Sequence, residues 1–545
     1  MRLLAELKRR KVFQTAAIYA AAAWLLLQVA ELLLQLFEVP AWGLRLVFVL
    51  LVIGFPLAII LSWMNQITPQ GVKREVDLPP VGPADEPAAA PIADNSIAVL
   101  PFDNMSDDPA NMHFADGLSE ELLNLLSRIQ GLRVVARTSS FSFRGRAVSA
   151  ATIAHELRVS HLLEGSVRKA GNRIRITAQL IRGADSSHVW SQAFDRNLTD
   201  IFAVQDEIAA AVVNELEIKL LGAATPKSWP TDPDAYAHFL RGRHLLELAS
   251  TTSYDKAITE FEAALSIDPK FAPAWAMLGS LYWGQANNSL IDYAEGARRA
   301  RANSERALAL NPNLAAPLSL LGYFDVIEGV DLDGGMRRME RARQLEPHNP
   351  LILTRLANIS IRRCRLEDAL RYCQQALASD PMSAIVHATF GNTLYLLGRL
   401  DEAEAMRRKV LELSPGWLSG HFHLGKVLLA RNDAVAALAE MQLEPSAFWR
   451  LVGLALVHHA LGNAAESDAA LREFTQMGLS GAAYQFAQVH AYRGEVDLAF
   501  EWLDRAAATH DSGLAFTRVD PLLACLHADS RWDRFLSRNG LVDRV

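Results

Sequence analysis

Hydrophobic and polar positions alternate with helical spacing over most of this chain, in units that repeat about every 34 residues. Pro347, Pro381 and Pro415 lie at the ends of three such units. Each follows an amphipathic stretch, and each must end a helix because proline cannot continue one. A fixed period of this length is typical of stacked helical hairpins. We therefore predict an all-α solenoid over residues 232–510, closed by a capping segment over residues 511–545.

The first 75 residues show a different pattern. Two apolar runs, Val12 to Phe37 and Ala41 to Met64, each exceed the roughly 20 residues that are needed to cross a bilayer. Lys and Arg residues flank the pair on both sides, which places both flanks in the cytoplasm. A cleaved signal peptide fits less well, because its apolar stretch would be too long and a second span follows it. Residues 1–75 are therefore predicted to form a two-span transmembrane hairpin.

A composition change follows at residues 76–95, where five prolines alternate with Ala, Asp and Glu. This Pro/Ala-rich linker is predicted to be extended, at about 3 Å per residue. Short apolar strands and amphipathic helices then alternate over residues 96–222, and Gly171-Asn172 predicts a tight turn between two of the strands. Such alternation within one module predicts a two-layer α/β domain.

Five sequence runs within this module carry a family resemblance. They are SIAVLPFDNMS from Ser96, FADGLSEEL from Phe114, VVARTSSF from Val134, LEGSVR from Leu163 and IFAVQDEI from Ile201. Together they resemble the bacterial TolB-like amino-terminal domain, in the form found ahead of tetratricopeptide repeats in membrane-anchored proteins. The resemblance implies a domain that is not itself catalytic. Some relatives carry a nucleotide-cyclase or DNA-binding domain upstream, and we expect neither in residues 1–95.

The repeats carry a second resemblance. Tetratricopeptide repeats show the pattern Trp-x-x-Leu-Gly-x-x-Tyr in their first helix, and Trp275, Leu278, Gly279 and Tyr282 reproduce it. The glycine would let two helix backbones approach closely. The resemblance implies a concave groove lined by first helices, and it carries the groove positions over to six residues. These are Ser280, Trp283, Asn392, Tyr395, Phe422 and Lys426. Their mixed polar and aromatic character suits a peptide or an extended segment, although solvent exposure or packing between repeats is an equally good explanation for each.

Catalytic candidates in the α/β domain are weak. His113, Asp116, Glu120 and Glu121 lie close together in sequence, but helix capping by Asp116 and a solvated first turn account for the carboxylates. The segment from Ser139 to Gly145, which includes Arg144, could hold an anion, but an ordinary turn is favoured. We therefore predict no catalytic residues.

Other candidate motifs have simpler structural explanations. Gly420 to Lys426 matches the start of a phosphate-binding loop, but Val427 replaces the required Ser or Thr and the stretch is predicted to be helical. The histidine pairs are neighbours on a helix and do not share a face, so neither pair predicts a metal site. The three cysteines are too scattered for a disulfide framework or a zinc site. These residues are His421, His423, His458, His459, Cys364, Cys373 and Cys525. The repeat period instead places Cys364 at an inter-helix turn and Cys373 at a buried position of a second helix.

The charge of the chain argues against one class of partner. The net charge of −7 and the lack of a basic stripe argue against a nucleic-acid partner. The fold class is thus predicted to be multidomain: a two-helix membrane hairpin, a TolB-like α/β domain and an all-α tetratricopeptide solenoid. The predicted function is a membrane-anchored, non-catalytic scaffold without cofactor or metal, which binds a protein or peptide partner at a bacterial inner membrane. Its soluble domains would lie in the cytoplasm, or alternatively in the periplasm; the oligomeric state is not specified. The alternative function is an enzyme or signalling regulator with a nucleotide or other small ligand in the α/β domain.

Overall fold

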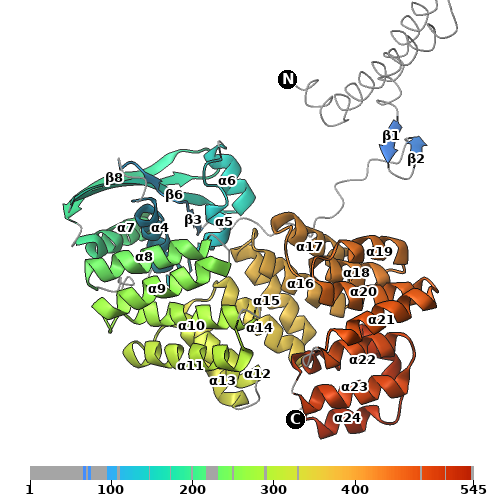
Figure 1. Ribbon diagram of the computed structural model, residues 1–545. Helices are drawn as coiled ribbons and strands as arrows, with labels where there is room; N and C mark the ends of the chain where they lie inside the picture. Colours follow the sequence, from blue (N-terminus) through green and yellow to red (C-terminus); the bar gives the residue numbers. More distant parts are fainter. Residues whose placement is uncertain are drawn as a thin grey trace, which may run out of the picture. The chain divides into compact units, whose positions relative to one another are not determined.

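The computed structural model divides into two units, residues 1–91 and residues 92–545. The structure describes residues 65–68, 71–74, 95–106, 111–129, 131–146, 148–171, 173–197, 200–215, 231–247, 251–287, 291–327, 331–478, 482–509 and 511–541. Figure 1 shows the elements of the second unit, in which an α/β domain is followed by an array of helical hairpins.

The predicted membrane hairpin requires a correction. In the first unit, β1 (Asn65–Thr68) and β2 (Gly71–Arg74) pair as antiparallel strands, with Asn65 opposite Arg74. Among the described residues no helix is both long and apolar enough to cross a membrane. The longest of them, α11 (Tyr293–Leu310), is amphipathic and rich in charged residues. The described residues therefore give no support to the predicted two-helix hairpin or to the inner-membrane location, and both apolar runs lie outside them.

The α/β domain is built on one mixed sheet with the strand order β5-β3-β6-β7-β8, and β4 pairs with β6. Strand β3 is parallel to β5 and β6, whereas β6, β7 and β8 form an antiparallel meander. The strands are β3 (Ser96–Val99), β4 (Asp103–Asn104), β5 (Arg133–Val134), β6 (His161–Ala170), β7 (Arg173–Arg182) and β8 (His188–Asn197).

Both faces of this sheet are covered. Ile97 and Val99 pack in a core with helices α4 (Met112–Ser127) and α7 (Ile201–Glu215). Ala98 and Leu100 point the other way and pack with α6 (Ala150–Leu157). Successive strand residues face opposite sides of a sheet, so a strand that is apolar at every position is buried on both faces. The domain therefore has a partial third layer that the two-layer prediction lacked.

Eight helical hairpins follow within the described residues, which confirms the predicted repeat solenoid (Figure 1). The first helix of each pair is α8 (Pro233–Glu247), α10 (Ala272–Asn287), α12 (Ala315–Ile327), α14 (Pro350–Arg362), α16 (Ala384–Leu396), α18 (Gly420–Ala430), α20 (Ala447–Ala460) and α22 (Ala483–Tyr492). The second helices are α9 (Thr251–Ile267), α11, α13 (Leu332–Leu345), α15 (Leu366–Ser379), α17 (Leu400–Leu413), α19 (Ala434–Leu443), α21 (Ala464–Gln476) and α23 (Val496–Ala508).

Small residues set the spacing inside the hairpins. A Cβ atom added at Gly279 would lie 2.6 Å from Ser304 Oγ, and one added at Gly322 would lie 2.7 Å from the Gly335 carbonyl oxygen. The turns between paired helices have a second requirement, because Cys364, Gly398 and Asn432 all have positive φ angles. The structure thus places Cys364 at an inter-helix turn, as the period predicted.

The α/β domain docks on the array at two places. At the first, Arg243 of α8 is buried and forms ion pairs with Glu120 and Glu121 of α4. At the second, Ser139 of the short helix α5 (Arg137–Phe141) donates a hydrogen bond of 2.6 Å to the carboxylate of Asp380, which follows α15. These contacts join the domain to the first and the fourth hairpin.

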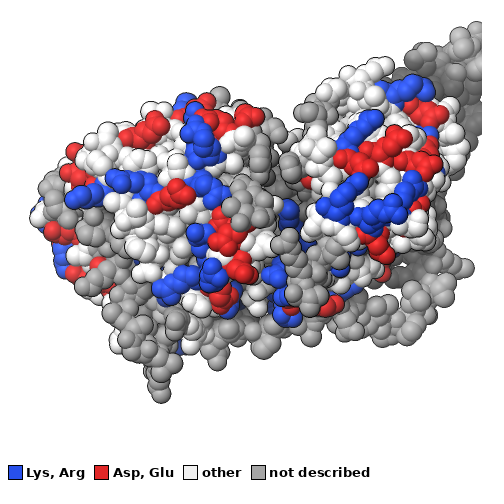
Figure 2. Space-filling model, turned by 90° about the horizontal axis from the view of Figure 1, so that it is seen from below, with Lys and Arg blue, Asp and Glu red and all other residues white. Residues whose placement is uncertain are grey.

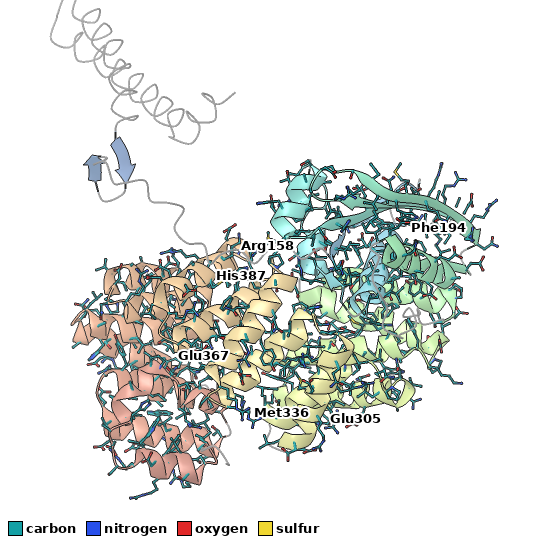
Figure 3. The ribbon with its side chains drawn as sticks, turned by 180° about the vertical axis from the view of Figure 1, so that it is seen from behind. Arg158, Phe194, Glu305, Met336, Glu367 and His387 are labelled. Atoms are coloured by element: carbon teal, nitrogen blue, oxygen red, sulfur yellow. The ribbon has the colours of Figure 1, made fainter. Side chains whose placement is uncertain are left out.

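Backbone contacts surround the second docking site. The amide of Ala136 donates to the Ser379 carbonyl at 2.8 Å, and Arg133 donates both to the Ala378 carbonyl and to the Arg158 carbonyl. Figure 3 shows Arg158 on the side of the domain that faces the array. Burial raises the pKa of the Asp380 carboxyl to about 6, against the opposing effect of hydrogen bonds from Ser139, Thr138 and Ser383.

The C-terminal residues contribute two short 3₁₀ helices, η3 (Ser512–Phe516) and η4 (Pro521–Leu526), and the last helix α24 (Trp532–Arg538). Leu523, Trp532 and Phe535 pack with Phe500 and Leu503 of α23 in one apolar cluster. This packing covers the last hairpin. The segment 511–526, called the strap below, also enters the concave side of the array.

The close approach at Gly322 predicts the effect of one added methyl group. Gly322→Ala should destabilise the chain by about 1–3 kcal/mol, because the new Cβ meets a backbone carbonyl that cannot move without separating α12 from α13. Gly416→Ala is the control, since nothing lies within 4 Å of its added Cβ. Denaturant unfolding of the two variants measures the difference; equal stability would contradict the packing described.

The raised pKa of Asp380 predicts a pH dependence. Between about pH 4 and about pH 6 the folded chain keeps this proton while the unfolded chain releases it, so the contribution of Asp380 to stability falls as pH rises through that window. Asp380→Asn cannot ionise. Its free energy of unfolding should therefore gain up to about 3 kcal/mol relative to the parent chain over this range. Asp497→Asn, at an exposed carboxylate, is the control that should show no such trend.

Candidate functional site

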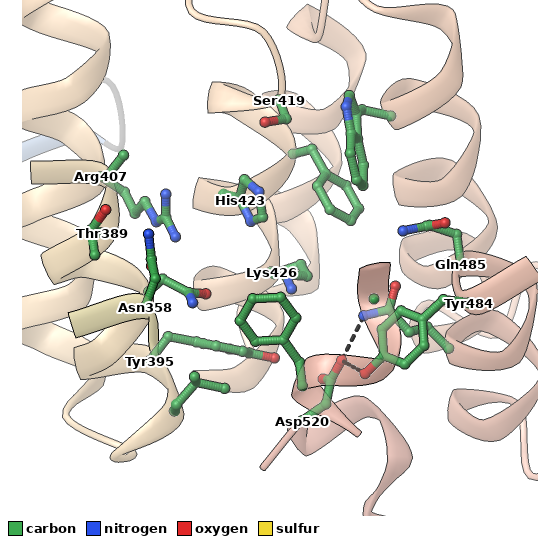
Figure 4. Close-up of a pocket in the computed structure, with 18 of the residues that line it drawn as sticks. Asn358, Thr389, Tyr395, Arg407, Ser419, His423, Lys426, Tyr484, Gln485 and Asp520 are labelled. Atoms are coloured by element: carbon green, nitrogen blue, oxygen red, sulfur yellow. Dashed lines mark hydrogen bonds between the residues drawn. The ribbon is translucent and has the colours of Figure 1, made fainter. Parts of the chain in front are cut away.

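The six predicted groove residues separate into two groups. Asn392, Tyr395, Phe422 and Lys426 line one cavity of about 370 Å³ on the concave side of the array, shown in Figure 4. Ser280 and Trp283 do not line this cavity. The Trp283 ring packs instead against Phe324 of the next hairpin, with ring centroids 4.8 Å apart. For Trp283, packing between repeats is therefore a sufficient explanation.

First helices form most of the cavity wall, because each hairpin turns the same helix toward the concave side. Helices α14, α16, α18, α20 and α22 contribute Asn358, Ile385, Ala388, Thr389, Asn392, Tyr395, Leu396, Phe422, His423, Lys426, Trp449, Tyr484, Gln485 and Gln488. Arg407, from the second helix α17, also reaches the cavity, and so do Trp417 and Ser419 from the loop before α18. Gly513, Phe516 and Asp520 of the strap complete the lining.

The strap is held by hydrogen bonds to α22. Asp520 is buried, and its carboxylate accepts hydrogen bonds from the Tyr484 hydroxyl at 2.9 Å and from Gln488 Nε2 at 2.6 Å (Figure 4). The same side chain caps η4 by accepting from the Leu522 amide. On the other side of the cavity, Phe516 packs with Tyr395 in the cluster of α14 and α16. The strap therefore bridges the groove from α22 to α14.

Arg407 occupies a second-helix position that is Met or Cys in three other hairpins and Ser304 in the second hairpin. Met339, Cys373, Arg407 and Met441 follow one another at intervals of 34 residues, and all four are buried. Arg407 is only 5% exposed. Its Nε atom lies 3.1 Å from where a Cβ of Gly391 would be, so the absent side chain at Gly391 leaves room for the guanidinium. Figure 4 shows the Arg407 side chain extending toward the cavity.

Lys426 is the second cation. It is 8% exposed, and its Nζ lies over the rings of Tyr395 at 5.1 Å and Phe422 at 5.5 Å from their centroids. Burial lowers the pKa of the Lys426 ammonium, and burial lowers the pKa of Arg407 to about 10. Arg407 thus remains charged at neutral pH. Cation–π contacts stabilise a buried cation only in part, because they supply no anion.

His423 lies beside these two cations. Burial, together with the charges of Arg407 and Lys426, holds the pKa of the imidazole well below its usual range. The ring is therefore neutral at physiological pH. The charged residues of the lining are then Arg407, Lys426 and Asp520, which leaves one positive charge in excess.

Several polar atoms of the lining have no hydrogen-bond partner within the described residues. They are Arg407 Nε, His423 Nδ1 and Gln485 Oε1, and all three are buried. Arg407 and Lys426 also form no ion pair in the described part of the chain, whereas Arg408, next in sequence, pairs with Glu404 at 2.8 Å on the outer surface. Figure 2 shows mixed acidic and basic side chains on the face that it presents.

The candidate carboxylates of the α/β domain lie in a different setting from the predicted one. Helix α4 begins at Met112 after Asn111, so Asp116 does not cap it. Asp116 is 2% exposed and accepts from Arg144. Burial opposes its ionisation, but the hydrogen bonds of His244 and Arg144 hold the pKa of Asp116 below its usual value. Glu120 and Glu121 pair with Arg243, as described above. The predicted solvated first turn is therefore wrong, since these groups bury ion pairs at the docking interface.

The positions and contacts of the remaining candidates from the sequence indicate structural roles. Gly420 to Lys426 forms the first turns of α18, as predicted, and no strand precedes it. His421 Nδ1 lies 2.8 Å from Glu440, and the ring of His459 lies 6.0 Å from that of Tyr492. Cys373 is buried and Cys525 is exposed. Among the described residues, no three His, Cys, Asp or Glu side chains are placed to share a metal ion.

The residues that sequence reasoning missed differ in the signal they carry. Arg407 could have been found, because an arginine at a position that is Met or Cys in neighbouring repeats departs from the pattern. Asp520 and Phe516 carry no such signal, since their place in the groove depends on how the chain returns after the last hairpin. His423 was predicted not to bind a metal, and its place in the cavity was not predicted.

The fold and the cavity define the class: the chain contains tetratricopeptide repeats, and its concave face holds a polar and aromatic cavity. A family model described as a tetratricopeptide repeat matches residues 330–388. A second model, described as the second domain of HilA/YgeH-like transcriptional regulators, matches residues 93–211. The TolB-like resemblance of the α/β domain has no counterpart in these matches.

Two kinds of relative are similar in sequence. A Rhizobium meliloti protein with the printed name "Putative adenylate cyclase 3" is 43% identical over 203 residues, which are 37% of this chain and 34% of that protein. The transcriptional regulator HilA of Salmonella typhimurium is 22% identical over 354 residues, which are 62% of this chain and 61% of HilA. The chain thus spans less than two thirds of either relative.

Solved structures with low sequence identity match part of this chain. PilW, a type IV pilus biogenesis factor, matches with 18% identity and a TM-score of 0.31, covering 44% of this chain and 98% of PilW. Human IFIT1 matches with 13% identity and a TM-score of 0.41, covering 62% of this chain and 77% of IFIT1.

The strap contacts predict the cost of removing one carboxylate. Asp520→Ala should destabilise the chain by about 2–3 kcal/mol, because it leaves the buried Tyr484 hydroxyl and Gln488 amide without their acceptor. Amide hydrogen exchange of residues 511–526 should accelerate in the variant. Asp504→Ala, at an exposed ion pair, serves as the control. Unchanged exchange of the strap would show that Asp520 does not hold it.

Proposed function

We propose that this chain is a non-catalytic adaptor that binds a protein partner through the concave face of its tetratricopeptide array. The observation that supports the proposal most directly is the convergence of Asn392, Tyr395, Phe422 and Lys426 on one cavity. Polar groups that fix orientation, set among aromatic side chains, are typical of binding sites. The array needs no catalytic group for this role, since its stacked hairpins supply an extended binding surface.

In this proposal the α/β domain over residues 96–222 is a TolB-like support, an assignment that rests on the sequence motifs given above. It contacts the first and fourth hairpins and would hold the groove in one curvature. The proposed domain boundaries are 96–222 for the support, 232–510 for the array and 511–545 for the cap. The cap would also form part of the binding site, since the strap lies within it.

A regulator with a small ligand in the α/β domain is the second candidate, favoured by the name of the Rhizobium meliloti relative. A cavity of about 580 Å³ lies near the end of β3 and is lined by Asp103, Arg144 and Glu164 among others. Arg144 is already paired with Asp116, so the two carboxylates of Asp103 and Glu164 face the same space with one further cation, Arg146. An anionic nucleotide is therefore poorly matched there, although thermal stabilisation of the full chain by a nucleotide would support this candidate instead.

Site-specific photo-crosslinking tests the adaptor proposal. A photoreactive residue at Ile385, which lines the cavity and is 46% exposed, should form an adduct with one polypeptide in living cells. The same residue at Val435, 73% exposed on α19, is the matched control and should not form that adduct. Asn392→Trp, which fills the cavity, should abolish the Ile385 adduct. Equal adducts from both positions, or an adduct that survives Asn392→Trp, would contradict the proposal.

A further inference from the structure

The cavity is lined by polar groups that have no hydrogen-bond partner in the described part of the chain. Within the described residues, Arg407 Nε, His423 Nδ1 and Gln485 Oε1 are buried without hydrogen-bond partners, and the Lys426 ammonium lies over two aromatic rings without an ion pair. Buried polar groups are almost always hydrogen-bonded in folded proteins. Unused groups from α17, α18 and α22 around one cavity therefore indicate a ligand that pairs with them.

Arg407 carries the strongest part of this argument. A buried arginine without an anion lowers stability, and Met or Cys serves the same packing position in the neighbouring hairpins. Packing therefore does not require an arginine here. The glycine at position 391 leaves the space that lets the guanidinium lie along α16. An arginine provides fixed N–H donors that suit an oxyanion, which points to a ligand rather than to the fold.

The charges of the lining select the kind of anion. Arg407 and Lys426 face the cavity together with one carboxylate, Asp520, whose oxygens already accept from Tyr484 and Gln488. One positive charge is therefore in excess, which matches a monoanion. Asp520 would repel a dianion such as a phosphate monoester more strongly. A carboxylate is the monoanion that arginine binds with the best geometry.

The other groups that line the cavity indicate which kind of molecule carries the carboxylate. Gln485 Oε1 is an acceptor without a donor, so the ligand should bring an N–H group. Trp449 packs against Phe422 with ring centroids 4.9 Å apart, and Trp417 also lines the cavity. This aromatic wall suits an apolar side chain. A carboxylate, an N–H donor and an apolar side chain occur together in a peptide.

We propose that the cavity bounded by α16, α18, α22 and the strap binds a carboxylate on a partner polypeptide, with Arg407 and Lys426 as its ligands. This inference rests on the adaptor function proposed above. A free C-terminus and an Asp or Glu side chain share this chemistry, and the experiment separates them. Because the strap bridges the groove, the ligand enters a bounded cavity instead of running along the whole array.

Calorimetric titration of the full-length chain with three peptides tests the proposal. The probes are acetyl-Ala-Ala-Phe with a free carboxylate, the same peptide with an amidated end, and acetyl-Ala-Asp-Phe-amide. One acidic probe should bind saturably, and the neutral amide should bind at least about tenfold more weakly. Stronger binding of the first probe identifies a C-terminus as the source, and stronger binding of the third identifies an acidic side chain.

Variants separate binding from folding. Arg407→Gln and Lys426→Gln should each lower the affinity for the acidic probe at least about tenfold and leave the affinity for the neutral amide unchanged. Arg408→Gln is the matched control, since Arg408 is adjacent, equally charged and 53% exposed on the outer surface. If Arg407 and Lys426 had only a structural role, the affinities for the acidic and the neutral probes would change together. Circular dichroism checks that each variant is folded.

Three results would overturn the carboxylate proposal. They are no saturable binding of either acidic probe up to about 10 mM, equal affinity for the acidic and amidated probes, and unchanged acidic binding in Arg407→Gln. If crosslinks from Ile385 still form in cells while any of these results is obtained, the adaptor function stands and only the carboxylate site falls. If neither crosslinks nor probe binding occur, both proposals fall.

Discussion

The burial of each helical hairpin against its neighbours is the interaction on which the rest of the structure depends. A single hairpin presents too little apolar surface to be stable alone, and stacking buries a continuous core. The same stacking turns every first helix toward one side, and this is why residues from α14 to α22 meet around a single cavity. Binding surface and stability therefore have one cause in this chain.

The hairpins differ at the positions where function is proposed. At one second-helix position of the third to sixth hairpins, Met339, Cys373 and Met441 pack in the core, whereas Arg407 reaches the cavity. A buried cation costs stability unless it is paired, so its presence is best explained by an anion that comes from elsewhere. The strap adds a boundary, because Asp520 and Phe516 join the two sides of the groove. The α/β domain contacts the array at Arg243 and Asp380.

How much of the structure could be predicted from the sequence depends on how far apart in the sequence the interacting residues lie. The hairpin period and the turn at Cys364 depend on neighbouring residues, so they were predictable, and four of the six groove residues do line one cavity. Asp116 and Glu120 were misplaced because Arg243, Arg144 and His244 are distant in sequence and no local pattern reveals them. The strap was predicted only as a cap, since its second contact with α14 depends on the curvature of the whole array.

The central claim is that the array holds a preformed cationic cavity in which the buried Arg407 binds an anion supplied by a partner. A crystal structure of the full chain with the tripeptide acetyl-Ala-Ala-Phe tests it most directly. The account predicts a carboxylate within hydrogen-bonding distance of Arg407 and Lys426, with the peptide backbone near Gln485 and the strap in place. An empty cavity in which Arg407 turns away to pair with a carboxylate of the chain itself would contradict it.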